Sequence, residues 1–351
     1  MKRYLRYIKF IYKKPILILR VAVNYFRIYI LKKDVLRKVD ISLTFRCHCN
    51  CDKCSSFKMF NSETSELSVE EIRDAAKQSI ILGAIQINLV GGEPLLRKDI
   101  FEIIKALCPS KVFVSINTTG LLLNKQMIER LRDSGVDMIK MSLDSPIALE
   151  HDKYRNSPGY FNKVIENLKL IKNTKGVRGH ISTVTIPENI RNNKLFEILK
   201  IAERFDATLA LTVPAAVGKW SNNYAMFINS NDRKILNELL EKHSLVTQDL
   251  HSSYKEIKCP AGTESLYITS YGDVIPCSLL QISFGNIRKE KLKIIYERML
   301  CFEPLKKSVP ICKAGESRSF IDEWLKPIAN VSLFPVNIWE HPSFTKNGNK
   351  K

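Results

Sequence analysis

Short apolar runs alternate with amphipathic stretches along the chain from residue 39 onward. Each run has the length of a buried strand, about 4 to 8 residues, and each amphipathic stretch repeats its apolar positions at helical spacing. The runs predict six strands, at Val39–Phe45, Ile85–Val90, Val112–Asn117, Met138–Leu143, Gly179–Ile186 and Ala207–Val213. Strands that alternate with helices indicate βα units and a parallel sheet.

The amphipathic stretches predict helices between and after these strands. Ser68-Val69-Glu70-Glu71 is a capping box that starts one helix, which runs toward Leu82. Further helices are expected at Asp99–Leu107, Lys125–Ser134, Tyr160–Lys172, Asn193–Arg204 and 231–243. Periodicity leaves open whether the sheet is doubly wound or curls toward a barrel. In both cases the site lies at the carboxyl ends of the strands.

Residues 1–38 follow a different pattern. The stretch Pro15–Leu31 is apolar except where Arg20, Asn24 and Arg27 interrupt it at i, i+4 and i+7. A membrane-spanning helix needs about 20 mostly uncharged residues. The stretch therefore predicts a basic amphipathic helix that lies flat, with a basic stripe and an apolar face.

The positive charge of the chain is concentrated in the same segment. The formal net charge is +19, and residues 1–38 hold twelve basic residues against one acid, a net +11. Two interpretations stay open: a peripheral contact with anionic lipid headgroups, or a helix that packs on the body of the protein and leaves its basic side in water. Nucleic acid is not an expected partner, because the basic residues surround no known reading motif.

The cysteine content points to an intracellular metal-binding protein. There are nine cysteines, an odd number, and no N-terminal segment ends in a small-residue cleavage site. A secreted disulfide framework is therefore not expected. We interpret the cysteines as reduced thiols of a cytoplasmic protein, available for metal.

Four of the nine cysteines lie within eight residues, directly after the first predicted strand. Cys47, Cys51 and Cys54 stand at C-x3-C-x2-C, with Cys49 between them. Thiolates this close together select zinc, copper(I) or an iron–sulfur cluster, and the spacing is wrong for a zinc site. Three thiolates can instead hold three irons of a [4Fe–4S] cluster and leave the fourth iron open. Cys49 is interpreted as a loop thiol outside the motif.

Further motifs follow the next strand ends in order. They are Gly91-Gly92-Glu93-Pro94, Asn117-Thr118-Thr119-Gly120-Leu121, Ser142-Leu143-Asp144 with His151-Asp152-Lys153-Tyr154-Arg155 behind it, and Asn189. Together with the cysteine loop, this series resembles the radical S-adenosylmethionine (radical SAM) enzymes. The resemblance covers residues 39–215 and implies an α/β fold, a partial (β/α)6 barrel similar to a TIM barrel.

The resemblance also implies a cofactor and its binding residues. The open iron of the cluster would chelate S-adenosylmethionine, and its reductive cleavage would give a 5′-deoxyadenosyl radical that abstracts a substrate hydrogen. Gly91 and Gly92 would let the backbone approach the methionyl part. The other expected contacts are Glu93 with the ammonium group, Arg155 with the carboxylate, and Ser142 and Asn117 on the ribose side. Lys53 stands where the family usually has an aromatic residue beside adenine.

A second unit, residues 216–330, holds four of the remaining cysteines. Cys259 and Cys277 stand at C-x12-G-x4-C, and a Gly-Asn-Ile turn follows. This arrangement resembles the SPASM or shorter Twitch extension, which implies an auxiliary [4Fe–4S] cluster with Cys312 as a further ligand. Either Cys301 completes the set or the cluster keeps an open iron. Two small buried thiols in a β-hairpin are the alternative for the first pair. Residues 331–351 are expected to form a C-terminal tail.

The predicted function is hydrogen abstraction by a radical SAM enzyme. The basic field and the short second unit favour a small anionic or lipid-linked, sugar-like substrate, and a peptide substrate would call for a leader-binding domain of about 80 residues upstream. An electron donor such as flavodoxin or ferredoxin is expected. A peptide-modifying SPASM maturase and a non-catalytic metal-binding module are the alternatives. Asp144 and Glu264 are candidates for a base that acts on the substrate, and no residue is assigned a catalytic role.

Overall fold

The computed structural model describes residues 14–254, 256–307 and 309–346. All six predicted strands are present, and with three further short strands they form one sheet in the order β7-β6-β5-β4-β3-β2-β1-β8-β9. The strands are β1 (Lys38–Thr44), β2 (Gln86–Gly91), β3 (Phe113–Thr118), β4 (Met138–Ser142), β5 (Arg178–Val184), β6 (Thr208–Thr212), β7 (Val246–Thr247), β8 (Ser265–Ile268) and β9 (Val274–Ile275). All neighbouring pairs are parallel except β8 with β9.

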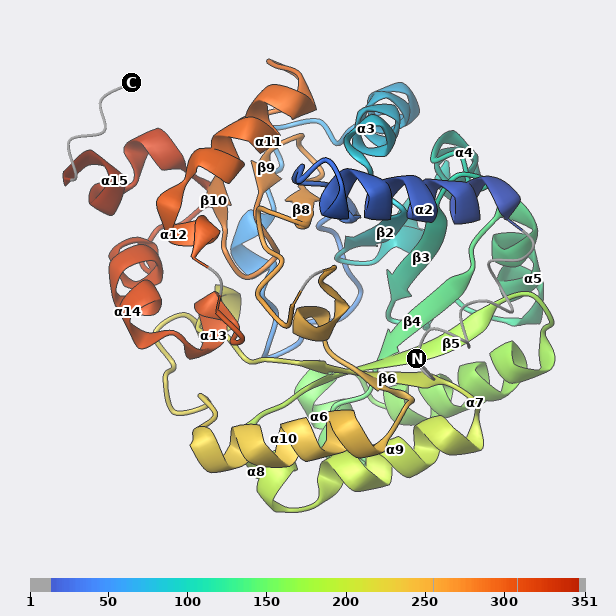
Figure 1. Ribbon diagram of the computed structural model, residues 1–351. Coiled ribbons are helices and arrows are strands. Elements are labelled where there is room, and N and C mark those ends of the chain that lie inside the picture. The colour runs from blue at the N-terminus through green and yellow to red at the C-terminus, as the bar shows by residue number, and fades with distance from the viewer. Residues whose placement is uncertain (1–13, 255, 308, 347–351) are drawn as a thin grey trace.

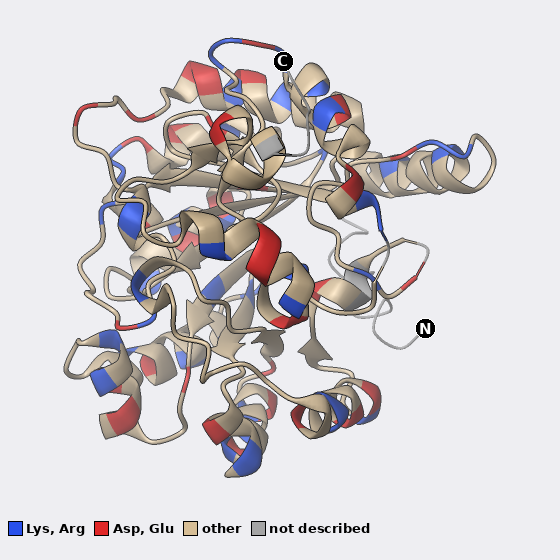
Figure 2. Cartoon of the chain, turned by 90° about the vertical axis from the view of Figure 1, so that its left-hand side faces the viewer, with Lys and Arg blue, Asp and Glu red and all other residues tan. Residues whose placement is uncertain are grey.

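The sheet curls into a partial barrel with helices on its outer side (Figure 1; Figure 2 gives the view at 90°). The helices are α2 (Pro15–Tyr29), α3 (Val69–Leu82), α4 (Ile100–Ala106), α5 (Lys125–Ser134), α6 (Ala148–Arg155), α7 (Tyr160–Asn173), α8 (Pro187–Arg191), α9 (Lys194–Arg204), α10 (Ser230–Lys242), α11 (Leu292–Cys301), α12 (Glu303–Lys306), α13 (Lys313–Glu316), α14 (Arg318–Phe320) and α15 (Pro342–Lys346). The predicted helices α3, α4, α5, α7, α9 and α10 are confirmed. The short helices α6 and α8 were not predicted, because they are too short to show a helical period.

Local signals explain where the long helices begin and end. The Ser68 side chain accepts from Glu71 N, Glu71 reaches back to Ser68 N, and α3 stops at Gly83 in the left-handed region at φ 117°. The Asn124 side chain caps α5 by accepting from Met127 N, without a reciprocal bond, and Gly135 ends the helix. The predicted capping box is therefore confirmed.

Alternation along the strands decides which side chains face the interior of the barrel. Ser115 Oγ and Lys140 Nζ both donate to Asn88 Oδ1, so these residues of β2, β3 and β4 face one another near the amino ends of the strands. Asn117 and Ser142 lie two residues further along β3 and β4 and therefore face the same side. This periodicity directs both residues toward the carboxyl-end mouth of the barrel, where the predicted cofactor site lies.

The second unit is not separate from the barrel sheet. Strand β8 pairs in parallel with β1, with Ser265 opposite Lys38. At the C-terminus, β11 (Val336–Asn337) pairs with β10 (Ile282–Ser283), and Phe334, Ile338 and His341 are buried. The expectation of a tail from residue 331 is therefore wrong as far as residue 346, because these side chains complete the core of the second unit. Residues 347–351 lie outside the described residues.

Helix α2 lies across the amino-terminal end of the barrel beside α3 (Figure 1). The Arg20 guanidinium donates to the carbonyl oxygens of Ile80 and Ala84, at and just beyond the end of α3, at 2.8 Å each. Asn24 is buried and donates to Gly83 O at 2.7 Å. The predicted polar stripe exists, but it faces the body of the protein, because Arg20 and Asn24 donate to backbone carbonyl groups at and just beyond the end of α3. The expectation that the basic side lies in water is wrong.

The first thirteen residues of the predicted basic segment lie outside the described residues. No helix within the described ranges is long and apolar enough to cross a bilayer.

Candidate active site

The cysteine loop leaves the carboxyl end of β1 and is held by neighbouring strand ends. Gly92 N donates to Thr44 O at 2.7 Å, and Glu93 N donates to Arg46 O at 2.8 Å. A Cβ on Gly91 would lie 2.1 Å from Thr44 O, and one on Gly92 would lie 2.2 Å from Arg46 O. Both positions therefore need glycine so that the end of β2 can contact the backbone that enters the cysteine loop.

Glu93 is fully buried and already has partners for its carboxylate. It accepts from Leu95 N at 3.0 Å, from Thr118 Oγ1 at 2.8 Å, and from Thr119 N and Thr119 Oγ1 at 2.6 Å. These bonds tie the end of β2 to the turn after β3. The carboxylate thus fixes the turn that follows Asn117, and this positioning role adds to the predicted contact with an ammonium group.

Three of the four loop cysteines interact directly in the structure. The hydrogen bond from the Cys49 thiol is the largest influence on the pKa of both Cys47 and Cys51. It lowers the pKa of Cys47, and it lowers that of Cys51 to about 6 against the effect of burial and with help from Arg155. The pKa of Cys49 itself is raised, so Cys49 keeps its proton. Burial raises the pKa of Cys54.

An ion pair stands directly beside the cysteine loop. The Arg155 guanidinium, at the end of α6, pairs with the fully buried Asp144 carboxylate and lies 3.8 Å from Cys51 Sγ. Burial acts to raise the pKa of Asp144, but Arg155 and then Lys53 outweigh it, and the pKa is lowered. A carboxylate held ionised in this way is a weak base. Asp144 therefore acts by orienting Arg155.

Several polar atoms near this pair are buried without a hydrogen-bond partner. They are Lys53 Nζ, His151 Nε2, Arg155 Nε and Asn189 Oδ1. Lys53 Nζ lies 3.7 Å from the centre of the Tyr154 ring, and Asn189 Nδ2 donates to Asp144 O at 2.7 Å. Buried polar groups are normally paired, so these atoms indicate that a polar ligand belongs here. Three thiols, a guanidinium and unpaired donors fit an iron–sulfur cluster with S-adenosylmethionine.

The predicted residues Asn117 and Ser142 flank this region from β3 and β4. Asn117 is exposed at the mouth and Ser142 is half-buried. The other carboxylate considered as a base lies elsewhere. Glu264 precedes β8 at the amino-terminal end of the barrel, where it pairs with Arg37 and Lys258. The barrel separates Glu264 from the cysteine loop.

The auxiliary cysteines form a second group. Burial raises the pKa of Cys277 to about 12, with Cys259 as the next cause. Burial also raises the pKa of Cys312, followed by the charges of Cys259 and Cys277. These mutual effects show that the structure brings the three thiols together.

Cys301 lies apart from this group. It is exposed at the end of α11, and it contributes to the pKa of Lys306 but not to those of the three grouped cysteines. Glu316, four residues after Cys312, accepts from Cys312 N at 2.9 Å and pairs with Arg233. The described residues contain no three His, Cys, Asp or Glu side chains close enough to hold a single metal ion. In a cluster, by contrast, each cysteine binds a different iron.

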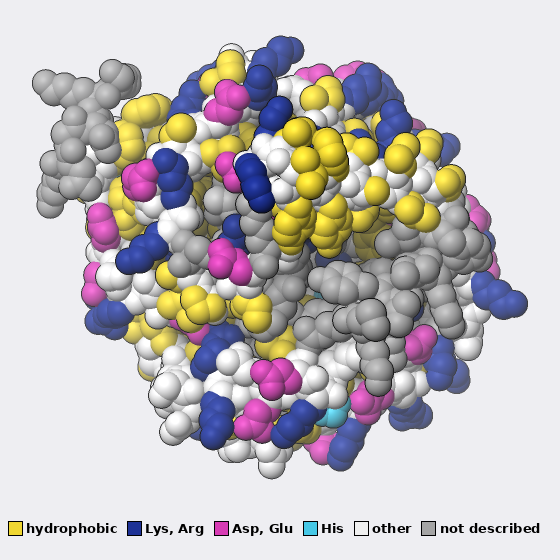
Figure 3. Space-filling model, viewed as in Figure 1, with side chains coloured by type: hydrophobic (Ala, Val, Ile, Leu, Met, Phe, Trp, Pro, Cys, Tyr) yellow, Lys and Arg dark blue, Asp and Glu magenta, His cyan; other side chains and the backbone are white. Residues whose placement is uncertain are grey.

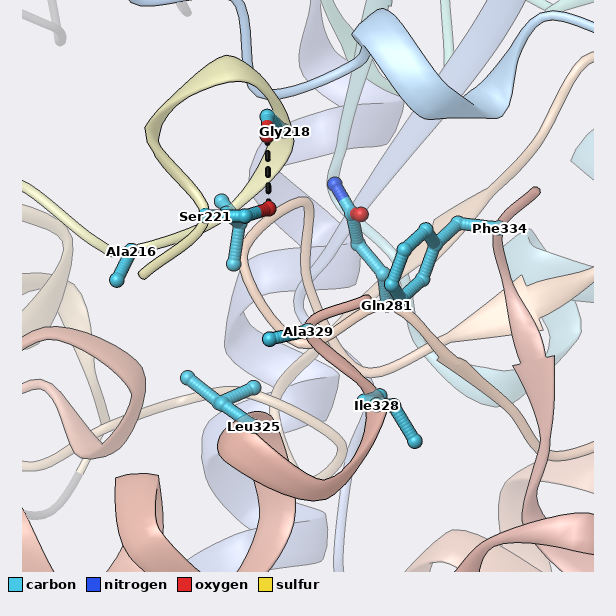
Figure 4. A pocket seen from close by; sticks show the side chains of 9 residues that line it. Ala216, Gly218, Ser221, Gln281, Leu325, Ile328, Ala329 and Phe334 are labelled. Atoms are coloured by element: carbon cyan, nitrogen blue, oxygen red, sulfur yellow. Dashed lines mark hydrogen bonds between the residues drawn. The ribbon is translucent and has the colours of Figure 1, made fainter. Parts of the chain in front are cut away.

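Packing contacts join the cysteine loop to the second unit. Lys219 N donates to Cys54 O at 3.0 Å, and Gln281 Nε2 donates to Ser55 O at 2.8 Å. A small pocket lies behind these contacts, lined by Gly218, Gln281, Leu325, Phe334 and their neighbours (Figure 4). Its volume of about 10 Å³ holds at most one water molecule. The pocket is a packing seam and not a substrate cavity.

Sequence reasoning missed several of these contacts. Thr118 and Thr119 were noted only as part of a turn, and their bonds to Glu93 needed the fold. The Gly218–Lys219 contact with Cys54 had no sequence signal, because it joins positions about 165 residues apart on two loops. Lys53 was detected as a departure from the family pattern, and that departure could have indicated a polar contact.

Comparisons with known proteins agree with this geometry. The radical SAM superfamily model matches residues 41–199, and the model of an iron–sulfur cluster-binding domain, SPASM, matches residues 259–314. The AdoMet-dependent heme synthase of Methanosarcina barkeri is 25% identical over 296 residues, which cover 77% of this chain and 84% of that protein. The PqqA peptide cyclase of Granulibacter bethesdensis is 25% identical over 279 residues, covering 74% of each chain.

Solved structures show the same fold. SuiB of Streptococcus suis, bound to its precursor peptide SuiA, superposes with a TM-score of 0.60 at 16% identity. The match covers 75% of this chain but only 65% of SuiB, less than two thirds of its length. This chain belongs to the radical SAM superfamily, as an enzyme that uses a [4Fe–4S] cluster with S-adenosylmethionine and has a C-terminal SPASM domain for auxiliary iron–sulfur chemistry.

Proposed function

We propose that Cys47, Cys51 and Cys54 hold the cluster that binds S-adenosylmethionine, and that the enzyme modifies a small anionic substrate. The observation that carries the first part is the position of Arg155, which lies 3.8 Å from Cys51 Sγ and is fixed by buried Asp144. When bound, the cluster and S-adenosylmethionine supply a carbon-centred radical that removes a hydrogen atom from the substrate.

The chain's own residues then bind and orient the cofactor. Arg155 offers its unpaired Nε, and Asn189 offers an unpaired oxygen. Glu93 holds the turn after β3 in place. Lys53 places a buried amine where the family usually has an aromatic side chain, so we propose that it donates to a polar atom of the cofactor or substrate.

Charge and aromatic rings around the cysteine loop support an anionic substrate. Lys219 Nζ lies 5.0 Å from the centre of the Phe57 ring, and Arg46 is exposed beside the loop, where it pairs with Glu66. Phe57 and Phe60 are also exposed. Cationic groups beside exposed rings suit an anion with a ring-shaped body, such as a phosphorylated sugar.

We propose that the reaction takes place in the cytoplasm, with the enzyme peripheral at the inner face of a membrane and with flavodoxin or ferredoxin as electron donor. A lipid-linked form of the anionic substrate fits this location. Support comes from the basic N-terminal segment, because juxtamembrane lysines and arginines are attracted to anionic lipid.

A peptide substrate is the second candidate. The similarity to a peptide cyclase over 74% of the chain favours it. The AdoMet-dependent heme synthase is similar over a comparable share, 77% of this chain, so the similarity does not decide between the two substrate classes.

The experiment that tests the proposal is anaerobic turnover. Reconstituted enzyme with dithionite and S-adenosylmethionine is expected to release 5′-deoxyadenosine, and release should rise when a phosphorylated sugar is added. Failure to release it would refute the cofactor assignment. A rise with short peptides and none with sugar phosphates would favour the peptide candidate.

A further inference from the structure

Helix α2 turns its apolar side away from the protein. Leu17, Asn24 and Ile28 are buried against the body, and Arg20 is bonded to the end of α3. The opposite side carries large apolar residues with exposed fractions between 46% and 65%, namely Ile16, Ile18, Leu19, Val23, Phe26 and Ile30. Figure 3 shows them as a band of hydrophobic side chains along α2.

The polar contacts prevent the helix from burying this band on its own protein. Turning α2 by half a revolution would remove Arg20 from two carbonyl groups and Asn24 from Gly83 O. Buried carbonyls without partners are costly. The helix is therefore held with its apolar side outward, and an exposed apolar patch of this kind marks a binding surface.

We infer that this band, the outer face of α2, docks the enzyme on an anionic lipid bilayer. The band lies along one helix on the outside of the molecule (Figure 3). Such a surface suits insertion into a lipid layer, whereas a partner helix needs a groove. Tyr25, Phe26 and Tyr29 supply rings of the kind found at membrane interfaces.

Basic residues that precede and follow the band in the sequence favour an anionic lipid surface as the binding partner. Lys32 and Lys33 are exposed directly after α2, and the sequence before it contains Lys2, Arg3, Arg6, Lys9 and Lys13 without an acid. Each basic residue near an anionic membrane surface adds to the attraction. This sequence arrangement is complementary to an anionic bilayer, because the apolar residues can contact the hydrocarbon layer and the basic residues can contact the headgroups.

The fold also fixes which way the active site points in the docked enzyme. Lys14 Nζ donates to Val112 O, just before β3, and pairs with Asp137, just before β4. Helix α2 therefore lies at the amino ends of the strands, and the cysteine loop lies at their carboxyl ends. With α2 on the bilayer, the mouth of the barrel faces the aqueous side.

This orientation rests on the proposed membrane location and narrows the proposed substrate. A substrate that reaches the mouth comes from the aqueous phase, so the soluble anion is favoured over its lipid-linked form. The orientation does not depend on radical chemistry, since vesicle binding requires no turnover.

Co-sedimentation of the full chain with vesicles tests the docking. Wild type is expected to bind phosphatidylcholine vesicles that contain phosphatidylglycerol. Leu19→Glu with Phe26→Glu should reduce binding by about tenfold or more. The matched control replaces exposed apolar residues elsewhere, Leu149→Glu with Ile294→Glu, and should bind like wild type. Equal binding by both double variants overturns the inference. So does a wild-type dimer in light scattering that becomes a monomer in the α2 variant, with no vesicle binding.

Tryptophan fluorescence tests the orientation. Phe26→Trp is expected to show extra fluorescence that brominated lipid quenches, whereas Leu149→Trp, 84% exposed at the start of α6 beside the mouth, should not be quenched. Quenching of Leu149→Trp would place the mouth on the bilayer and overturn the orientation. Release of 5′-deoxyadenosine without vesicles is measured separately, so loss of docking and loss of the proposed chemistry are distinguishable.

Discussion

The two cysteine groups of this protein differ in solvation. In the loop after β1, Cys47 is exposed and the pKa of both Cys47 and Cys51 is lowered. In the second unit, burial raises the pKa of Cys277 to about 12 and also raises that of Cys312. Since the thiolate is the metal ligand, Cys47 and Cys51 of the first group are prepared to bind iron. Cys54, whose pKa is raised by burial, and the two cysteines of the second group must lose protons as metal binds.

This difference separates two kinds of site. The first group lies beside unpaired polar atoms, among them Arg155 Nε and Lys53 Nζ, and is open to a ligand. The second is partly buried, with Cys277 and Cys312 packed against the core, and has no comparable set of unpaired atoms among the described residues. This difference supports the proposal that the first group binds the cofactor and that the second transfers electrons or supports the structure.

The largest effect on activity is expected from a variant that removes one cysteine of the first group. Cys51→Ala should lower the release of 5′-deoxyadenosine by more than about 10³-fold, because the cluster loses one of three ligands. Cys49→Ala is the comparison variant: it removes the hydrogen bond that lowers the pKa of Cys47 and Cys51 but no proposed ligand, so its loss should be much smaller. The assay is 5′-deoxyadenosine by chromatography. Equal loss in the Cys49 variant would make Cys49 a ligand.

The next effect concerns the charge beside Cys51. Asp144→Asn leaves Arg155 buried without its anion and should destabilise the protein by about 3–5 kcal/mol in urea unfolding. Asp133→Asn, which removes an exposed partner of Arg132, serves as the control and should change little. A small effect at Asp144 would show that Arg155 is held by other contacts.

The membership of the second group can be tested by replacing one cysteine that belongs to it and one that lies outside it. Cys277→Ala should lower bound iron from about eight to about four per chain, while Cys301→Ala should leave it unchanged, because Cys301 is exposed and apart. Iron and sulfide analysis measures both. Matching losses in the two variants would make Cys301 the fourth ligand.

The smallest effect concerns the contact between the barrel and the second unit. Arg288 bonds to Glu71 at the start of α3 and is the main cause that lowers the pKa of Glu71 from 4.5 to about 2. Because both side chains are partly exposed, Arg288→Ala should cost only about 0.5–1 kcal/mol.

The pH dependence of this contact follows from its sign. A carboxylate whose pKa is lowered in the folded state contributes stability above its unfolded pKa and loses it as the pH falls toward the folded value. The difference in urea unfolding between wild type and Arg288→Ala should therefore be the same at pH 7 and pH 5 and shrink only below about 4.5. A difference that disappears at pH 5 would contradict this assignment.

Much of the barrel could be predicted from the sequence. The six strands and the long helices follow from hydrophobic period and caps, both of which are local. The short helix α6, which delivers Arg155, has too few turns for a period. Its place became visible only through the family motif around His151 and Arg155.

The sequence by itself determined the features on which the chemistry of this protein depends. They are the spacing of Cys47, Cys51 and Cys54, the glycines at the end of β2, and the stripe of polar residues in α2. Tertiary structure decided how these features meet. Periodicity specifies which residues share a face of a helix. It does not determine whether that face packs on the protein or lies in solvent, because this depends on polar groups elsewhere in the chain that need hydrogen-bond partners. The carbonyls at the end of α3 drew Arg20 and Asn24 inward and left the apolar side of α2 outside.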